Sequence, residues 1–198
     1  MTSVASTTIG EFLERLGSRT PSPGGGATAA LTGALGVAQL KMVAEYCKWD
    51  GVPGDPRAGL GELAQALAAL AQRDADAYAA YTAANKRKAE DPAAFEREKA
   101  AILEVPVAML EACVAGLRQV EPVLPRSPQW FICDLAIAVS CLRAAFEGAY
   151  GLTAANLKPL PATARHPVVG ERVIAARAEF ERLRRDLDPR LLVRLGGA

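Results

Sequence analysis

The feature that most constrains this chain is a glycine-rich turn leading into a long uncharged segment. The turn reads Pro21-Ser22-Pro23-Gly24-Gly25-Gly26, and the segment from Gly24 to Leu40 contains no charged residue. Prolines restrict the backbone and remove N–H donors, whereas glycines let another group come close to the main chain. A helix that begins at about Gly25 leaves its first N–H groups unpaired, which suits an anion or a polar heterocycle. The alternative is a tight turn between two packed helices.

The helix after this turn, predicted from about Gly25 to Cys47, is unusually rich in small residues. Small residues recur along it at four-residue spacing and are expected to form one ridge: Gly26, Ala30, Ala34 and Ala38. Gly33 lies beside this ridge. Such a ridge lets neighbouring backbones approach, so we expect a crowded central helix in a bundle. The uncharged segment is shorter and more polar than a membrane span, which needs about 20 apolar residues. No P-loop or dinucleotide-binding fingerprint is present at the turn.

Composition and helix punctuation predict an all-α, multi-helical bundle that forms a single domain over residues 1–198. Hydrophobic residues make up 51% of the chain and aromatics only 6%, and the abundance of alanine favours closely packed helices. About six main helices are expected. Besides the uncharged helix, a capping box at Thr8–Glu11 opens a short helix, and a further helix is expected from about Arg57 to Lys88. Asp91-Pro92 opens the next, with a kink near Val105 because Pro106 lies inside it. Ser127-Pro128 opens one that reaches about Gly151, and the last runs from about Val168 to Asp186.

Charge and cysteine content exclude several classes of function. With 23 basic and 22 acidic residues the net charge is +1, which argues against nucleic-acid and membrane partners. The four cysteines are scattered without a Cys-x-x-Cys motif, and the N-terminus lacks signal-peptide features, so we expect a cytoplasmic protein. The single histidine, His166, lies in a proline-rich connector, which leaves no basis for a metal site or a Ser-His-Asp triad.

Asp74 is the first of two carboxylates that lie on otherwise apolar helical stripes. Spacings of three and four residues place it on one face with Leu67, Leu70, Tyr78, Tyr81 and Asn85. A buried charge is costly, so Asp74 should have a partner, a raised pKa or a place in a cleft. A purely structural hydrogen bond to another helix, or to Tyr78 or Tyr81, is the alternative.

Asp134 is the second such carboxylate. It shares a face with Ile137, Ala138, Cys141 and Ala145, about two turns inside the predicted helix and too far in to be its cap. Arg143 and Glu147, four residues apart, are expected to form a surface ion pair of little energetic weight. The chemistry left open by the sequence is proton transfer by carboxylates, helped by backbone donors.

The glycine turn and several later segments resemble the cyclodeaminase/cyclohydrolase family, which includes the C-terminal domain of formiminotransferase-cyclodeaminase. The specific part is Pro21 to Leu31; further likeness runs through Ala34-Leu35-Gly36, Met42-Val43, Asp74 to Tyr78, Val105-Pro106, Asp134 to Ala138 and Asn156-Leu157. The resemblance covers almost the whole chain. It implies an all-α homodimer that acts on tetrahydrofolate, either hydrolysing 5,10-methenyltetrahydrofolate to 10-formyltetrahydrofolate or cyclodeaminating 5-formiminotetrahydrofolate. The absence of a transferase half favours the cyclohydrolase slightly.

The same resemblance assigns roles to individual residues. It implies that Asp74 is catalytic, that Asp134 is a second carboxylate of the site, and that the substrate-binding residues are Pro23, Gly24, Gly25, Gly26, Tyr78 and Asn156. In this reading Tyr78 orients Asp74 and Asn156 donates to the folate. No metal, redox group or other cofactor is required.

The chain departs from the family pattern at two places that bear on substrate choice and activity. The asparagine-rich loop of relatives is replaced by Ser127 to Asp134, with Cys133 where a serine is usual, and Leu152 stands where a second asparagine is typical. Two alternatives therefore accompany the enzyme hypothesis: a non-catalytic folate-binding or regulatory protein of the same fold, and a structural dimeric bundle without a ligand.

Overall fold

The computed structural model describes residues 4–51, 53–157 and 167–196, and these residues form helices without any strand. The α-helices are α1 (Ile9–Leu16), α2 (Gly25–Glu45), α3 (Arg57–Lys86), α4 (Pro92–Val123), α5 (Ile132–Leu157) and α6 (Pro167–Arg194). Three short 3-10 helices, η1 (Val4–Ser6), η2 (Leu124–Arg126) and η3 (Gln129–Phe131), accompany them. The predicted all-α fold with six main helices is confirmed.

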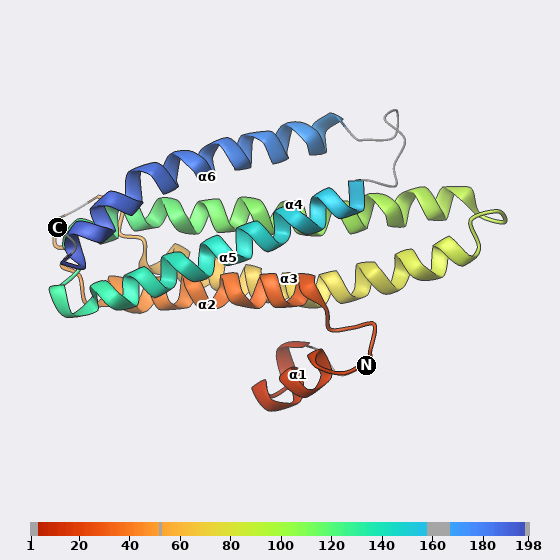
Figure 1. Cartoon of the computed structure of the whole chain (residues 1–198), viewed down its shortest axis with the longest axis horizontal. Coiled ribbons are helices and arrows are strands. Elements are labelled where there is room, and N and C mark those ends of the chain that lie inside the picture. Colours follow the sequence, from red (N-terminus) through yellow and green to blue (C-terminus); the bar gives the residue numbers. More distant parts are fainter. Residues whose placement is uncertain (1–3, 52, 158–166, 197–198) are drawn as a thin grey trace.

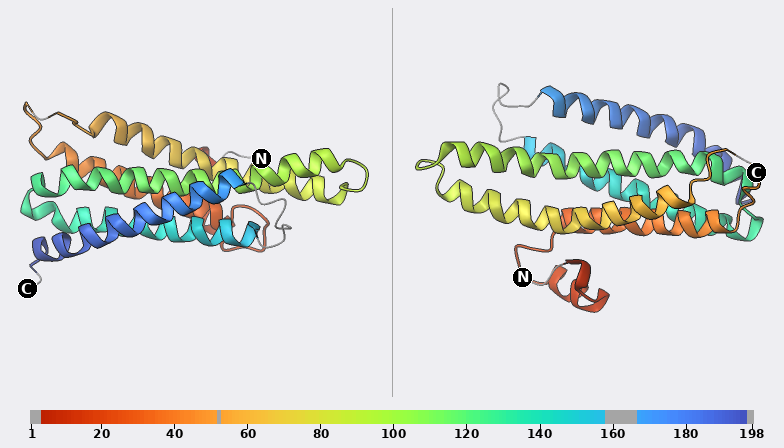
Figure 2. Two further views of the ribbon diagram at one scale, coloured as in Figure 1. Left: turned by 90° about the horizontal axis from the view of Figure 1, so that it is seen from above. Right: turned by 180° about the vertical axis from the view of Figure 1, so that it is seen from behind.

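Helices α2 to α6 form an elongated bundle, and α1 lies outside it (Figure 1). The central helix α2 packs mainly against α5 and α3, while α4 packs against α3, α5 and α6. At one end α3 and α4 continue past the other helices as a protruding hairpin (Figures 1 and 2). The core therefore thins along α3, where Leu67 and Leu70 are buried but Tyr78 is 46% exposed. The prediction that one face of this helix stays buried from Leu67 to Asn85 is wrong beyond its middle.

Local chemistry sets several helix ends as the sequence predicted. Thr8 and Glu11 form the capping box of α1, and the Asp91 carboxylate accepts from Ala94 N–H at the start of α4. Ser127, however, is not the cap of α5: its hydroxyl donates backwards to the carbonyl of Val123, and α5 begins only at Ile132. Helices α5 and α6 also extend beyond their predicted ends, while the connector that contains His166 lies outside the described residues.

The small-residue contact surface of α2 exists, but its register differs from the four-residue ridge. Gly26, Ala30 and Gly33 are buried, whereas Ala38 is exposed and Gly36 makes the close contact instead. A methyl group built on Gly36 would lie 2.9 Å from the carbonyl oxygen of Ala138 in α5. The reason is the helical period: steps of four residues drift by about 40° each at 3.6 residues per turn, so steps of three must be mixed with steps of four to stay on one face.

Ion pairs join α6 to its neighbours around its buried side chains Phe180, Leu183 and Leu187. Arg172 contacts both Glu104 and Glu111 of α4, each at 2.8 Å, and Arg118 of α4 contacts Glu179 of α6 at 2.8 Å. Arg143 of α5 pairs with Asp188 of α6, so the predicted Arg143–Glu147 pair is wrong. Folding brings Asp188, which is 45 residues away in the sequence, close to Arg143 in place of the local Glu147.

Two segments are long and apolar enough to cross a membrane by length and composition alone, Gly25–Glu45 and Pro92–Arg126. Within the bundle 50% and 56% of their most apolar windows are buried against other helices. Core helices of a helical bundle have this same composition, so the observation gives only weak support to a membrane location.

Candidate functional site

A cavity of about 280 Å³ lies where the glycine turn meets α3, α4 and α5. Four segments distant in sequence supply its walls: the turn itself, the middle of α3, the first half of α4 and the last turns of α5. The lining residues are Pro21, Ser22, Gly24, Gly25, Gly26, Asp74, Ala75, Tyr78, Ile102, Leu152 and Asn156. The structure thus brings together most of the residues that the sequence nominated.

Asp74 lies directly against the first turn of α2. Its carboxylate accepts a hydrogen bond from the backbone N–H of Ala27, one of the donors that a helix start leaves unpaired. A methyl group built on Gly26 would lie 2.0 Å from Oδ1 and 2.4 Å from Oδ2 of Asp74. The group that comes close to the main chain at the glycine turn is therefore the Asp74 carboxylate, and glycine at position 26 makes room for it.

The surroundings of Asp74 favour its neutral form. Burial raises the pKa of the Asp74 carboxyl above its ordinary value, and the hydrogen bond from Ala27 N–H opposes this rise only in part. Asp74 is also the only side chain with a formal charge among the residues that line the cavity. A carboxyl whose pKa moves toward neutrality can both accept and return a proton near physiological pH.

Asn156 and Tyr78 complete the polar part of the wall. The Asn156 side-chain nitrogen donates to the carbonyl of Ile102 at 3.1 Å, which ties α5 to α4 across the cavity. Tyr78 lines the cavity, but no hydrogen bond joins it to Asp74 among the described residues. The prediction that Tyr78 orients Asp74 has no support in this arrangement, because the hydrogen bond to the Asp74 carboxylate comes from the backbone N–H of Ala27.

Asp134 does not belong to this cavity. Its Oδ1 accepts from the side-chain nitrogen of Gln39 at 2.9 Å, and it lies in the first turn of α5 rather than two turns inside. Gln39 is 13 residues beyond Gly26 on α2, which places it about 20 Å away at 1.5 Å per residue. The prediction that Asp134 joins Asp74 at one site within this chain is therefore wrong. The last turns of α5 line the cavity, whereas Asp134 lies in the first turn, at the other end of the helix.

The cavity wall differs from the predicted one at Pro23, Ile102 and Leu152. Pro23 is buried within the turn and does not line the cavity, whereas its neighbours Pro21 and Ser22 do. Ile102 was not predicted, although its place four residues before Pro106 was a usable signal. Leu152 lines the cavity one turn before Asn156, so the departure from the family pattern at this position falls in the wall of the site.

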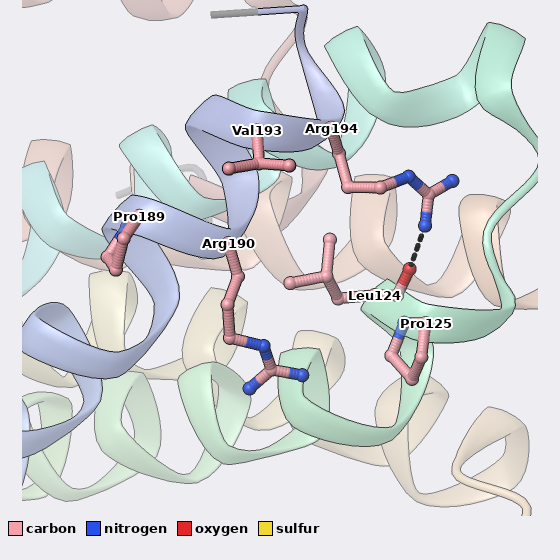
Figure 3. A pocket seen from close by; sticks show the side chains of 6 residues that line it. All are labelled: Leu124, Pro125, Pro189, Arg190, Val193 and Arg194. Carbon is pink, nitrogen blue, oxygen red and sulfur yellow. Dashed lines mark hydrogen bonds between the residues drawn. The ribbon is translucent and has the colours of Figure 1, made fainter. Parts of the chain in front are cut away.

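A second cavity, of about 380 Å³, lies at the opposite end of the bundle, between η2 and the end of α6 (Figure 3). It is lined by Leu124, Pro125, Pro189, Arg190, Val193 and Arg194. Both guanidinium groups are engaged: Arg194 donates to the carbonyl of Leu124 at 2.9 Å and Arg190 pairs with Asp186 at 2.6 Å. The lining of this cavity contains no carboxyl, thiol or hydroxyl group. The Asp74 cavity combines a carboxyl group with the glycine turn, and we place the candidate site there.

Across the described ranges, no group of three or more His, Cys, Asp or Glu side chains is placed to hold a metal ion. The polar side chains that line the Asp74 cavity are its carboxyl group, the hydroxyl groups of Ser22 and Tyr78, and the amide of Asn156.

Comparisons with known proteins agree with this picture. Residues 8–168 match the family described as formiminotransferase-cyclodeaminase. The methenyltetrahydrofolate cyclohydrolase of Methylorubrum extorquens is 29% identical over 146 residues, which cover 67% of this chain and 70% of that protein. The crystal structure of formiminotetrahydrofolate cyclodeaminase from Thermotoga maritima has the same fold, with a TM-score of 0.86, 21% identity and 98% of each chain covered. The chain belongs to the formiminotransferase-cyclodeaminase family.

Proposed function

We propose that this chain hydrolyses 5,10-methenyltetrahydrofolate to 10-formyltetrahydrofolate, with Asp74 as the acid–base residue. The observation that carries the proposal is a single carboxyl group of raised pKa, fixed by Ala27 N–H against the glycine turn inside a cavity. Support for the substrate class comes from the family and from the 29% identical cyclohydrolase. Cyclodeamination of 5-formiminotetrahydrofolate concerns the same bridging carbon and is tested alongside.

The charge of the cavity suits the reacting end of this substrate. The methenyl bridge between N5 and N10 is an amidinium cation, and Asp74 is the only formally charged side chain in the wall. The anionic glutamate end of a folate would meet repulsion there once Asp74 is ionised. At about 280 Å³ the cavity is slightly smaller than the roughly 300–1,000 Å³ typical of ligand sites, so it would hold the ring system and bridge rather than the whole folate.

The proposed reaction needs one proton carrier. A water oxygen forms a bond to the bridging carbon while Asp74 takes one of its protons, giving a tetrahedral carbon between N5 and N10. The bond from carbon to N5 then breaks as Asp74 returns the proton to N5. Loss of the remaining hydroxyl proton to solvent leaves the formyl group on N10, so the overall reaction consumes one water and releases one proton. One carboxyl group acts in both directions.

An assay with two substrates tests the proposal. We expect the purified protein to convert 5,10-methenyltetrahydrofolate, followed by absorbance, and to act on 5-formiminotetrahydrofolate slowly or not at all. The reverse preference would make it a cyclodeaminase. Binding of a reduced folate without turnover would favour the non-catalytic folate-binding alternative, and no binding would leave the structural bundle.

We also propose that the protein is a homodimer that uses the outer face of α2 and α5. Leu35 of α2 and Ile137 of α5 are 66% and 55% exposed, on either side of the close contact between the two helices. Every exposed residue of α2 before Lys41 is uncharged, which is unusual for a solvated helix. Two helices about 30 Å long and 10 Å wide present about 600 Å² per protomer, close to the ~800 Å² per partner of a standard interface.

Light scattering tests this interface. We expect a dimer for the unmodified protein and a monomer for Leu35→Glu, because a charge would be buried without a partner. Ile174→Glu is the matched control, since Ile174 is 70% exposed but lies on α6; it should remain dimeric. A dimer that survives Leu35→Glu and Ile137→Glu together would place the interface elsewhere.

A further inference from the structure

Pro106 leaves one backbone carbonyl of α4 without its usual partner. Within an α-helix the N–H of residue i donates to the carbonyl of residue i−4, and proline has no N–H. Pro106 is buried inside α4, so the carbonyl of Ile102 lacks the donor that helix geometry normally supplies. Ile102 is half-buried, and an unpaired carbonyl there costs free energy unless it finds another donor.

Asn156 supplies the missing donor from another helix. Its Nδ2 lies 3.1 Å from the carbonyl oxygen of Ile102. A backbone carbonyl can only accept a hydrogen bond, so the amide must face Ile102 with its nitrogen and cannot be turned over without losing the contact. The proline on α4 therefore determines which way the amide on α5 is oriented.

The orientation leaves the amide oxygen free for an occupant of the cavity. Asn156 and Ile102 both line the cavity, and no residue in the described part of the chain donates to Oδ1 of Asn156. That oxygen is also not among the buried atoms that lack a partner, so a ligand can reach it. With one N–H of Nδ2 held by Ile102, the amide presents its oxygen, an acceptor, at a fixed place in the cavity wall.

We infer that Pro106 is a positioning residue that acts through Ile102 and Asn156 to present Asn156 Oδ1 as an acceptor for an N–H group of the substrate. The inference rests on the proposed function, and a reduced pterin carries suitable donors at N3, N8 and the 2-amino group. A site built to pair with an N–H discriminates against analogues that lack it. The amide oxygen thus recognises the pterin by a hydrogen bond, while Asp74 performs proton transfer at the bridge.

Replacing the proline should loosen substrate recognition without weakening the fold. In Pro106→Ala the new N–H can pair with Ile102, and the Asn156 amide is released. We expect KM for 5,10-methenyltetrahydrofolate to rise about threefold to tenfold, the range of one neutral hydrogen bond, with kcat changed less than about twofold. The unfolding temperature should stay equal or rise, because an internal proline disfavours a helix.

Pro122→Ala is the matched control. Pro122 is also inside α4 but lies about 24 Å farther along the helix axis, so KM should not change. Asn156→Leu, which removes the acceptor at similar size, should raise KM at least as much as Pro106→Ala. An unchanged KM in either Pro106→Ala or Asn156→Leu overturns the inference.

A double-mutant cycle on stability separates this inference from the proposed function. The carboxylate in Asn156→Asp cannot donate to Ile102, so we expect it to lower the unfolding temperature more in the unmodified chain than in the Pro106→Ala background, where Ile102 already has a partner. Equal lowering in both backgrounds would show that the two residues are not coupled. If the unmodified protein neither binds nor converts a reduced folate, the proposed function and the ligand role of Oδ1 both fail. The stability cycle then decides the coupling by itself.

Discussion

Asp74→Asn should lower the turnover of 5,10-methenyltetrahydrofolate by about 10²- to 10⁴-fold, the usual contribution of a general acid–base residue. The amide keeps the size of the carboxylate and can still accept the hydrogen bond from Ala27 N–H, so binding of the folate ring should change far less. Measuring kcat and KM separately distinguishes the two effects. Retention of more than about a tenth of the rate would show that another group moves the proton.

The same variant should be at least as stable as the unmodified protein at neutral pH. Because folding raises the pKa of Asp74, its favourable contribution is fully present below the unfolded-state pKa of about 3.9 and is lost as the pH rises through the folded-state pKa. At neutral pH the ionised carboxylate is held in a site that disfavours charge, and the amide relieves this. Thermal unfolding at pH 7 and below pH 4 measures the difference, which should shrink at the lower pH.

The dependence of kcat/KM on pH should report the ionisation of Asp74. Asp74 must be ionised to take a proton from water, so the rate should fall on the acid side with a midpoint above the ordinary aspartate value. A midpoint at or below about 3.9 would contradict the raised pKa.

Gly26→Ala should reduce activity by roughly 100-fold, a loss within the range for an acid–base residue. Its methyl group would overlap Oδ1 of Asp74 at 2.0 Å, so the carboxylate must leave Ala27 N–H and with it the position from which it reaches the bridge. Initial rates and circular dichroism together test this, since the helical content should remain.

Two comparisons make the Gly26 result specific. Gly59→Ala makes the same change on α3, where a methyl group meets nothing within 4 Å, and should keep full activity. Gly26→Ala combined with Asp74→Asn should be no slower than Asp74→Asn alone, because both changes act on one group. Additive losses would mean that Gly26 contributes by another route.

The sequence predicted what local chemistry determines. The caps at Thr8 and Asp91 depend on residues within four positions, and both appear as expected. The stripe that nominated Asp74 held because Leu67 and Leu70 lie on the same face and are buried. The glycine turn was also identified as a place of close approach.

The errors concern features that need the tertiary arrangement. Arg143 pairs with Asp188 rather than Glu147 because α6 packs nearby. Tyr78 is exposed because α3 and α4 extend past the core. Asp134 shares an apolar stripe with its neighbours as Asp74 does, yet periodicity gives no information on which end of the bundle a stripe reaches.

The steric contact between Gly26 and Asp74 has a consequence for how such sequences diverge. A side chain at position 26 overlaps the Asp74 carboxylate as this backbone stands, so the glycine is constrained as long as a side chain of that size and position occupies residue 74. While the carboxylate acts, a side chain at position 26 displaces it and lowers activity; once a smaller residue has replaced the acid, a small side chain at position 26 costs nothing more. Drift at position 26 would therefore mark, in a newly read homologue, a lineage that has already abandoned proton transfer.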